Sequence, residues 1–148
     1  MGRVLRTLLP DGIYHAYTRG TGPIVIFRDE ADYDACLLML RSTGRRFSWR
    51  LITYCLMPTH YHVVLETRIE DLSNGMQRLN SSYAHYFNRR HGRTGALFQG
   101  RFHSRLIESD EHMERLCAYV PLNPVRAGHC DRAQDWPWSW SAYGLAQS

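Results

Sequence analysis

Residues 54–66, which read YCLMPTHYHVVLE, decide the fold and point to the chemistry of this chain. The run is rich in strand-forming residues, pauses at Pro58-Thr59 and resumes as a second extended segment, a pattern typical of two antiparallel strands joined by a tight connection. Successive side chains of a strand point to opposite faces of the sheet. His60 and His62 are therefore expected on one face, and Tyr61 on the other.

Two histidines on one face of a strand suit metal binding. Residues two positions apart in a strand lie roughly 6–7 Å apart at their Cα atoms, so both imidazoles can reach one divalent ion. Two neutral nitrogen ligands do not complete the coordination of such an ion, so a third protein ligand and open positions for substrate are expected. The alternative is a pair of half-buried histidines on a sheet surface, and spacing alone leaves both interpretations open.

The composition indicates one globular domain over residues 1–148. The chain has 148 residues, of which 44% are hydrophobic and 22% charged, as in ordinary soluble domains. No apolar run is long enough to span a bilayer and no secretory leader is visible, so we expect a cytoplasmic protein without a membrane partner. The four cysteines are scattered without C-x-x-C spacing, which favours reduced thiols over disulfides or a structural zinc site.

The distribution of basic residues favours a nucleic-acid partner. The formal net charge is +4, and all 18 basic residues are arginines, whose planar fork matches phosphate. No carboxylate lies between Asp71 and Glu108, and this interval interleaves arginines with aromatic residues. A solvated basic face is the alternative. On charge and position, the candidates for phosphate contacts are Arg89, Arg90, Arg93 and Arg101.

The order of predicted elements is that of a ferredoxin-like α+β fold, an antiparallel sheet with helices packed on it. We expect a strand over 13–18, a helix over 30–42 capped by Asp29, a strand over 47–56 and the histidine strand after it. A helix with apolar residues at positions 72, 76, 79, 83 and 86/87 follows and ends at Gly92. An extended segment over 96–107 leads to an extra helix capped by Ser109 or Asp110. The aromatic tail, 135–143, is expected to fold back over the core as a lid.

The nine tyrosines are abundant candidate nucleophiles. No serine lies in a G-x-S-x-G elbow, and of the four cysteines only Cys130 has an adjacent histidine, His129. A phenol is a weak nucleophile but a fair leaving group, so a phosphotyrosyl bond is reversible. Tyr119, on the extra helix, is favoured because Asn123 lies one helical turn later and its amide oxygen could reach the same ion. The alternative for Tyr119 is a residue on the flank of an amphipathic helix.

The stretch 57–65 and six further segments resemble, in the same order, the single-tyrosine HUH transposases, which include the REP-associated tyrosine transposases (RAYT). The stretch 57–65 looks like their His-hydrophobic-His signature. The other matching segments are Tyr14-His15 with Arg19-Gly20, Ile26–Asp29, Tyr86–Arg90, Gly95–Phe102, Tyr119–Gly128 and Trp136–Ser139.

This resemblance implies a ferredoxin-like core that cleaves and rejoins single-stranded DNA at hairpins through a 5′-phosphotyrosine intermediate. It implies that His60, His62 and Asn123 bind Mg²⁺ or Mn²⁺ and that Tyr119 is the nucleophile. Some relatives are dimers, so a homodimer is a possible state of this chain.

The sequence departs from the family pattern at two positions. Thr59 stands where the family commonly has Asn, and Tyr61 stands where it has an aliphatic residue. Pro121 lies between Tyr119 and Asn123 and removes one backbone donor there. Two alternatives to a transposase stay open. One is a DNA-hairpin-binding protein that no longer cleaves. The other is an HUH nuclease of replication or plasmid transfer, which the absence of a helicase or primase module disfavours.

Overall fold

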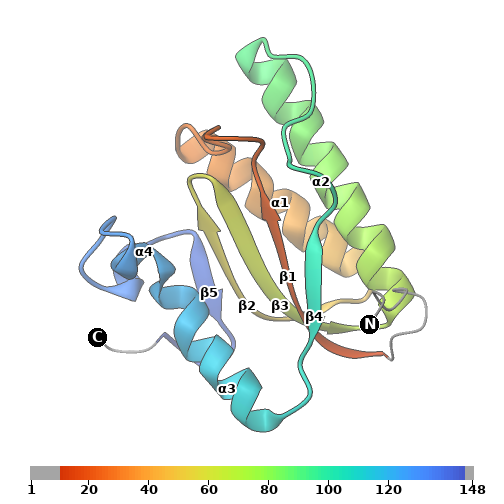
Figure 1. Ribbon diagram of the computed structural model, residues 1–148, viewed down its shortest axis with the longest axis vertical. Coiled ribbons are helices and arrows are strands. Elements are labelled where there is room, and N and C mark those ends of the chain that lie inside the picture. The colour runs from red at the N-terminus through yellow and green to blue at the C-terminus, as the bar shows by residue number, and fades with distance from the viewer. Residues whose placement is uncertain (1–10, 146–148) are drawn as a thin grey trace.

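A computed structural model describes residues 11–145, which form a five-stranded antiparallel sheet with helices on both faces (Figure 1). The strand order is β4-β1-β3-β2-β5. The strands are β1 (Gly12–Arg19), β2 (Arg50–Met57), β3 (His60–Thr67), β4 (His103–Leu106) and β5 (Ser139–Ser141). The first four strands follow the ferredoxin-like order with two intervening helices, so the predicted fold class is confirmed.

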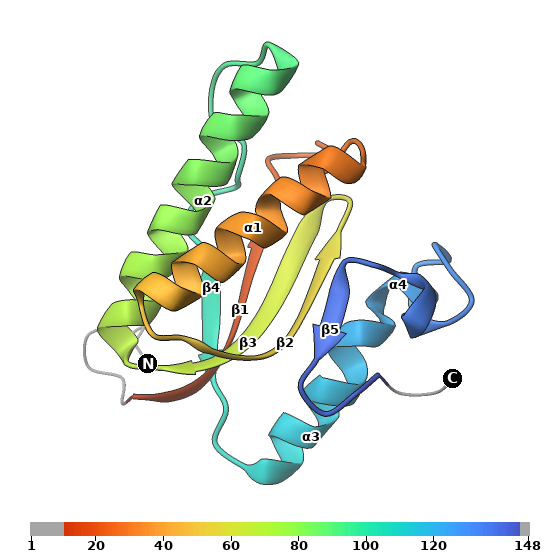
Figure 2. The same ribbon diagram turned by 180° about the vertical axis from the view of Figure 1, so that it is seen from behind.

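Two long helices, α1 (Glu30–Arg46) and α2 (Ile69–His91), cover one face of the sheet (Figure 2). Their apolar stripes bury Leu40, Leu72 and Met76 in the main core against the strands. Asp29 caps α1 by accepting a hydrogen bond from the backbone N–H of Asp32, as the sequence predicts. No helix in residues 11–145 is long and apolar enough to cross a membrane.

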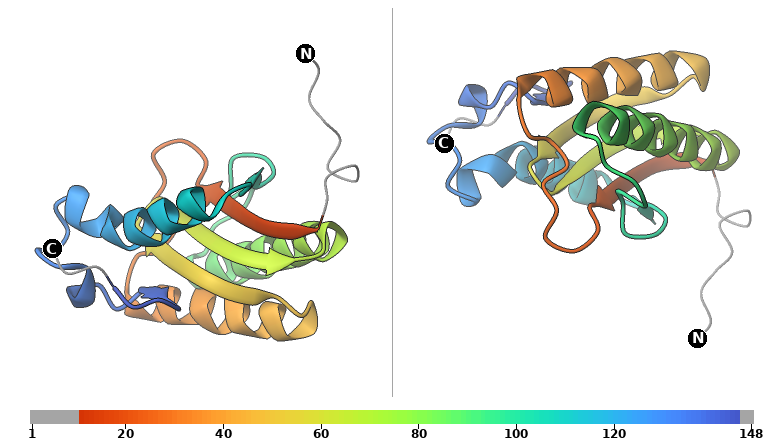
Figure 3. Two further views of the ribbon diagram at one scale, coloured as in Figure 1. Left: turned by 90° about the horizontal axis from the view of Figure 1, so that it is seen from below. Right: turned by 90° about the horizontal axis from the view of Figure 1, so that it is seen from above.

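The opposite face carries α3 (Asp110–Tyr119), the short turns η2 (Val120–Leu122) and η3 (Ala133–Asp135), and α4 (Asn123–Arg126) (Figure 3). Cys117 and Val120 pack on Ile52, Met57 and Val64 in a second, smaller core. This second layer lies over the β2 and β5 side of the sheet. No described helix crosses in front of β1 or β4 in Figure 1, so part of this face is left uncovered by helices.

Two predicted boundaries are wrong. Helix α1 runs through Gly44 to Arg46, and the strand begins only at Arg50, because buried Trp49 packs under the helices and donates from Nε1 to the carbonyl of Asp71 (3.1 Å). The segment 96–107 is a strand only over β4, with an isolated bridge between Gly20 and Phe98. Glycines with positive φ at 95 (89°) and 100 (68°) turn the chain before the strand can form.

The aromatic tail folds back onto the core, as expected, and also adds a strand. β5 pairs with the outer edge of β2. Trp138 stacks on Tyr33, with ring centroids 4.0 Å apart, and Trp136 donates from Nε1 to the carbonyl of Leu56 (2.9 Å). The tail therefore completes both the sheet and the aromatic part of the main core.

Candidate active site

The two histidines of β3 lie on the face opposite to α1 and α2, together with polar side chains from β1 and β4. The register pairs Tyr17 with His62 across β1 and β3, and Tyr17 with His103 across β1 and β4. Opposed residues point to the same face of a sheet, so the three rings gather there. The rings of Tyr17 and His103 stack at 4.7 Å. The prediction that His60 shares a face with His62 is confirmed.

Tyr61 lies on the other face, as predicted. Its side chain is 1% exposed in the main core, and its hydroxyl donates to the amide oxygen of Asn80. The Asn80 amide in turn donates to the hydroxyl of Thr18 (3.0 Å). The aromatic residue at this position therefore serves packing beneath the helices and does not enter the histidine face.

Each histidine of the pair already has one ring nitrogen engaged. A 3.0 Å hydrogen bond joins Nδ1 of His62 to Nε2 of His15, and a 3.1 Å hydrogen bond joins Nδ1 of His60 to the hydroxyl of Thr59. The two rings lie 5.1 Å apart at nearly a right angle (89°). The Nε2 atoms of both rings are left for a ligand. A partner on the second ring nitrogen is the usual arrangement for histidines that bind metal ions.

Burial keeps these imidazoles neutral. Desolvation, followed by repulsion from His15 and His60, lowers the pKa of His62 to about 3. Desolvation and the charges of His112 and Arg105 lower the pKa of His15 to about 4. The pKa of His60 is also lowered, mainly by burial. All three rings thus retain unprotonated nitrogen at neutral pH, the form that metal ions require.

Tyr119 is the last residue of α3, and its side chain is 55% exposed. The guanidinium of Arg126 lies 3.6 Å from the centroid of its ring, a cation–π contact. Pro121 and Pro124 cannot donate backbone hydrogen bonds, so the helix tightens into η2 and the N–H of Asn123 bonds to the carbonyl of Val120. The carbonyl of Tyr119 then accepts from Arg126 instead (3.0 Å).

The amide of Asn123 is also engaged. Its Nδ2 donates to the carbonyl of Val120 (3.0 Å), and its Oδ1 accepts from Arg126 (3.0 Å). Residues 11–145 contain no group of three or more His, Cys, Asp or Glu side chains placed to hold a metal ion. The donor set that fits an ion is therefore two histidine nitrogens. The amide oxygen of Asn123 accepts one hydrogen bond from Arg126 and keeps a second lone pair for a ligand.

The tyrosine helix and the histidines lie on the same face of the sheet. Val120, the residue after Tyr119, packs with Met57 and Val64 in the second core, so the end of α3 lies over the strands that carry the histidine pair. No hydrogen bond or ring contact joins Tyr119 to His60 or His62 within the described chain. The structure therefore brings the predicted site residues together as two separate pairs. Tyr119 and Asn123 both contact Arg126, and His60 lies beside His62.

An open groove runs along the exposed side of α3 next to the candidate nucleophile. The side chains that line it are His112, Arg115, Leu116, Ala118, Tyr119, Leu122 and Arg126.

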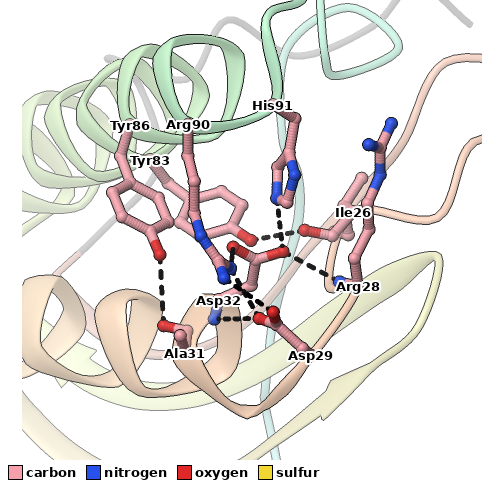
Figure 4. A network of polar contacts seen from close by, with 9 residues as sticks. All are labelled: Ile26, Arg28, Asp29, Ala31, Asp32, Tyr83, Tyr86, Arg90 and His91. Atoms are coloured by element: carbon pink, nitrogen blue, oxygen red, sulfur yellow. Dashed lines mark hydrogen bonds and ion pairs between the residues drawn. The ribbon is translucent and has the colours of Figure 1, made fainter.

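The candidate phosphate ligands fall into two groups. Arg90 donates to both Asp29 (2.6 Å) and Asp32 (2.7 Å), so binding of phosphate by Arg90 would require these ion pairs to break (Figure 4). Arg93 bonds to the amide oxygen of Asn88 and to loop carbonyls at the end of α2.

Arg89 and Arg101 are exposed and have no ion pair among the described residues. Their role in phosphate binding stays a prediction.

His15 was missed as a site residue. It appears in the sequence only as part of a segment that resembles the transposases, and its partner lies 47 positions later. Alternation along the strand over 13–18 places position 15 on a face with 17, but only the register with β3 shows that this is the face of His62.

The ferredoxin-like sheet, the His-x-His pair and the tyrosine at the end of an extra helix on the same face have the arrangement that the resemblance to tyrosine transposases implies. The chain belongs to the IS200-like transposase family, because the model of that family matches residues 13–123.

Three relatives show how far the similarity extends. A Haemophilus influenzae protein (strain ATCC 51907 / DSM 11121 / KW20 / Rd) assigned as a REP-associated tyrosine transposase is 26% identical over 110 residues, 67% of this chain and 62% of that protein. The chain thus spans 62% of the length of that relative.

The structure of a REP-associated tyrosine transposase bound to a REP hairpin superposes with a TM-score of 0.74, at 18% identity, over 94% of this chain and 82% of that one. A Deinococcus radiodurans protein assigned as a transposase gives a TM-score of 0.53 at 16% identity, over 77% of this chain and 90% of that one. These two likenesses show the fold.

Proposed function

We propose that this chain is a metal-dependent transposase that cleaves and rejoins single-stranded DNA at hairpins, with Tyr119 as the nucleophile. The observation that carries the proposal is the neutral histidine pair, each with Nδ1 engaged, on the face of the sheet that also bears the tyrosine helix. Family membership supports it, and a structural relative is bound to a REP hairpin.

The reaction proceeds as a transesterification. The phenol oxygen of Tyr119 attacks the scissile phosphorus as the phenol loses its proton, and a tyrosyl O–P bond forms. The bond between phosphorus and the 3′ oxygen breaks, and that oxygen takes up a proton to become a free 3′-OH. Because the phosphotyrosine retains the bond energy of the diester, a 3′-OH of another strand can reverse the step without ATP.

Mg²⁺ or Mn²⁺ would be held by Nε2 of His60 and Nε2 of His62, with the amide oxygen of Asn123 as third ligand. When bound, the ion supplies Lewis acidity at a phosphate oxygen. Arg126 could keep its bond to this oxygen, which has a second lone pair for the ion. Its guanidinium, already over the phenol ring, has further N–H groups that could donate to the phosphate.

Covalent capture tests the nucleophile. Wild type, Tyr119→Phe and Tyr143→Phe would be incubated with labelled hairpin-bearing single-stranded oligonucleotides and Mn²⁺, then separated under denaturing conditions. Tyr143 is the matched control because its side chain is also exposed (63%). A shifted band is expected in wild type and Tyr143→Phe, and none in Tyr119→Phe or with chelator. A band that persists in Tyr119→Phe would disprove the assignment.

A hairpin-binding protein that no longer cleaves is the second candidate. Arg126 holds both the ring of Tyr119 and the amide oxygen of Asn123, which favours this candidate because both groups are engaged with a neighbour. Retention of hairpin binding with no covalent product in Mn²⁺, across hairpins of varied sequence, would support it over the transposase.

The homodimer and the cytoplasmic location expected from the sequence stay predictions. Sedimentation of the purified chain, with and without hairpin DNA, would test the first of them.

A further inference from the structure

We propose that His15 is a positioning residue for His62. It accepts a hydrogen bond from Nδ1–H of His62 and thereby holds the His62 imidazole in the tautomer whose lone pair is on Nε2. The part of this inference that concerns metal binding rests on the proposed function. The hydrogen bond between the two rings is observed without metal, and the tautomer can be measured without it.

The contact is well placed to orient a ring. Nε2 of His15 lies 3.0 Å from Nδ1 of His62, and the ring centroids are 5.2 Å apart. β1 and β3 are adjacent inner strands of the sheet, and each is paired on both of its sides. The two imidazoles are therefore carried by the part of the fold in which backbone register is most firmly fixed.

A bond between two neutral imidazoles allows only two proton arrangements. If Nδ1 of His62 carries the proton, the lone pair of His62 is on Nε2. If Nε2 of His15 carries it, the proton of His62 moves to its own Nε2, which then cannot bind a metal ion. In the first arrangement His15 carries its proton on Nδ1, and in the second His62 carries its proton on Nε2; within residues 11–145 neither of these nitrogens has a hydrogen-bond acceptor. Only the first arrangement leaves the lone pair of His62 on Nε2 for an ion, and it is the one that we assign.

His60 and His62 differ in how firmly they are held. The partner of His60 is the hydroxyl of Thr59, which rotates and can either donate or accept (3.1 Å). The partner of His62 is a planar ring that changes its role only by moving a proton between its own nitrogens. His15 therefore fixes one ligand, while Thr59 leaves the other adaptable.

His15 does not act as a third ligand through this nitrogen. The Nε2 atom of His15 points at His62, so the same atom cannot bind an ion that His62 binds on the far side of its ring. This separates a residue that acts through His62 from a residue that touches the ion.

The tautomer can be measured without metal. The ¹⁵N chemical shifts of the His62 ring would be recorded at pH 7.5 in metal-free wild type, His15→Phe and His15→Gln. His103→Phe is the matched control, because His103 lies on the same face and stacks on Tyr17 without a hydrogen bond to His62. We expect protonated Nδ1 in wild type, His15→Gln and His103→Phe, and a mixture in His15→Phe. Protonated Nε2 in wild type, or an unchanged spectrum in His15→Phe, would overturn the proposal.

Metal affinity gives the second readout, by calorimetric titration with Mn²⁺. His15→Phe is expected to weaken binding by about 10–100-fold, the usual effect of removing a partner of a ligating histidine. His15→Gln should recover most of the loss, because its amide oxygen can accept from Nδ1–H, and His103→Phe should bind as wild type does. Equal losses in His15→Phe and His103→Phe would overturn the positioning role. If His62→Ala binds Mn²⁺ as well as wild type does, the proposed metal site fails, and the tautomer measurement still decides the role of His15.

Discussion

Two polar clusters lie on opposite faces of the sheet and differ in how completely their atoms are satisfied. On the helix face, Asp29, Asp32, Arg90 and His91 form a network in which each carboxylate binds a cation (Figure 4). On the other face, the histidine pair keeps its Nε2 atoms without a protein partner in the described chain. A cluster that satisfies its own charges is structural, whereas one that leaves ligand atoms open is suited to bind something else.

The helix-face network fastens the start of α1 to the end of α2. Asp32 is fully buried and accepts from the backbone N–H of Arg28 (2.9 Å), from Arg90 (2.7 Å) and from His91 (2.8 Å). Beside it, the hydroxyl of Tyr83 donates to the carbonyl of Ile26. Acidic residues at a helix start and basic residues at a helix end also match the two helix dipoles.

The sharpest test of the contrast removes one histidine from each cluster. His62→Ala is expected to reduce DNA cleavage by about 10²–10³-fold, because an electrostatic catalyst of the phosphate is lost with the metal site. His91→Ala should leave the cleavage by folded protein unchanged and should lower the melting temperature. Cleavage and thermal unfolding would be measured on both variants. A loss of cleavage in His91→Ala at a temperature where it is folded would contradict the division of roles.

Removal of the buried carboxylate should cost the most stability. Asp32→Ala leaves Arg90 and His91 without their buried partner, and a loss of about 3 kcal/mol in the free energy of unfolding is expected. Asp34→Ala is the matched control, since Asp34 is an exposed carboxylate of the same helix. Denaturant unfolding measures both. Equal losses in the two variants would mean that the network contributes nothing beyond its charges on the helix.

A pair of helix glycines tests how tightly the helix face is packed. A Cβ at Gly75 of α2 would lie within 2.8 Å of Cε2 of Trp49, whereas one at Gly44 of α1 would lie 3.8 Å from its Cβ. Gly75→Ala is therefore expected to lose about 1–3 kcal/mol through overpacking. Gly44→Ala should be neutral or slightly stabilising. Urea unfolding of both would show whether α2 can move away from the indole, in which case Gly75→Ala would also be neutral.

The two clusters should also contribute to the free energy of unfolding over different pH ranges, and this effect is smaller. The low pKa values of His15 (about 4) and His62 (about 3) mean that the fold binds fewer protons than the unfolded chain, so their stabilisation is complete above about pH 6.5 and is lost as pH falls toward 3. A loss of about 2 kcal/mol, about 1 kcal/mol for each histidine, is expected between pH 6.5 and 5.5.

The aspartates act in a lower window. The ion pair with Arg90 lowers the pKa of Asp29 to about 2, and hydrogen bonds and ion pairs also lower the pKa of Asp32, so their contribution holds above about pH 4 and fades as pH falls toward 2. Denaturant unfolding measured from pH 8 to pH 3 would show the loss of stability that comes from the histidines. His15→Phe should make the free energy of unfolding depend less on pH in this range. An unchanged dependence would contradict the low pKa of His15.

The sequence predicts the parts of this molecule that depend on local pattern. Alternation places His60 and His62 on one face and Tyr61 on the other, and the order of apolar periods predicts the ferredoxin-like sheet. The cap at Asp29 and the stop at Gly92, which adopts a left-handed φ of 62°, follow from single residues.

Long-range partners could not be predicted. The segment between Asp71 and Glu108 contains no carboxylate, but Arg90 forms an ion pair with Asp32, which lies 58 positions earlier. The end of α1 was misplaced because the burial of Trp49 outweighs the tendency of Gly44 to end a helix. Arg126 lies three positions after Asn123, yet its hydrogen bonds to the carbonyl of Tyr119 and to Oδ1 of Asn123 could not be predicted. They form because the two prolines and the tightened turn leave the carbonyl of Tyr119 free to accept from Arg126.

The position of β5 has a consequence for synthesis of the chain. β2 lies at the edge of the four-stranded core, and its outer hydrogen-bonding groups are covered by β5 and the residues beside it, from Trp136 to Ala142. During translation this edge stays open from the moment β2 pairs with β3 until more than seventy further residues have left the ribosome. An unpaired edge of buried, apolar sequence is a template for association with other nascent chains. The aromatic tail thus acts as the closing step of folding, and the interval before it arrives is when this protein is most prone to aggregate.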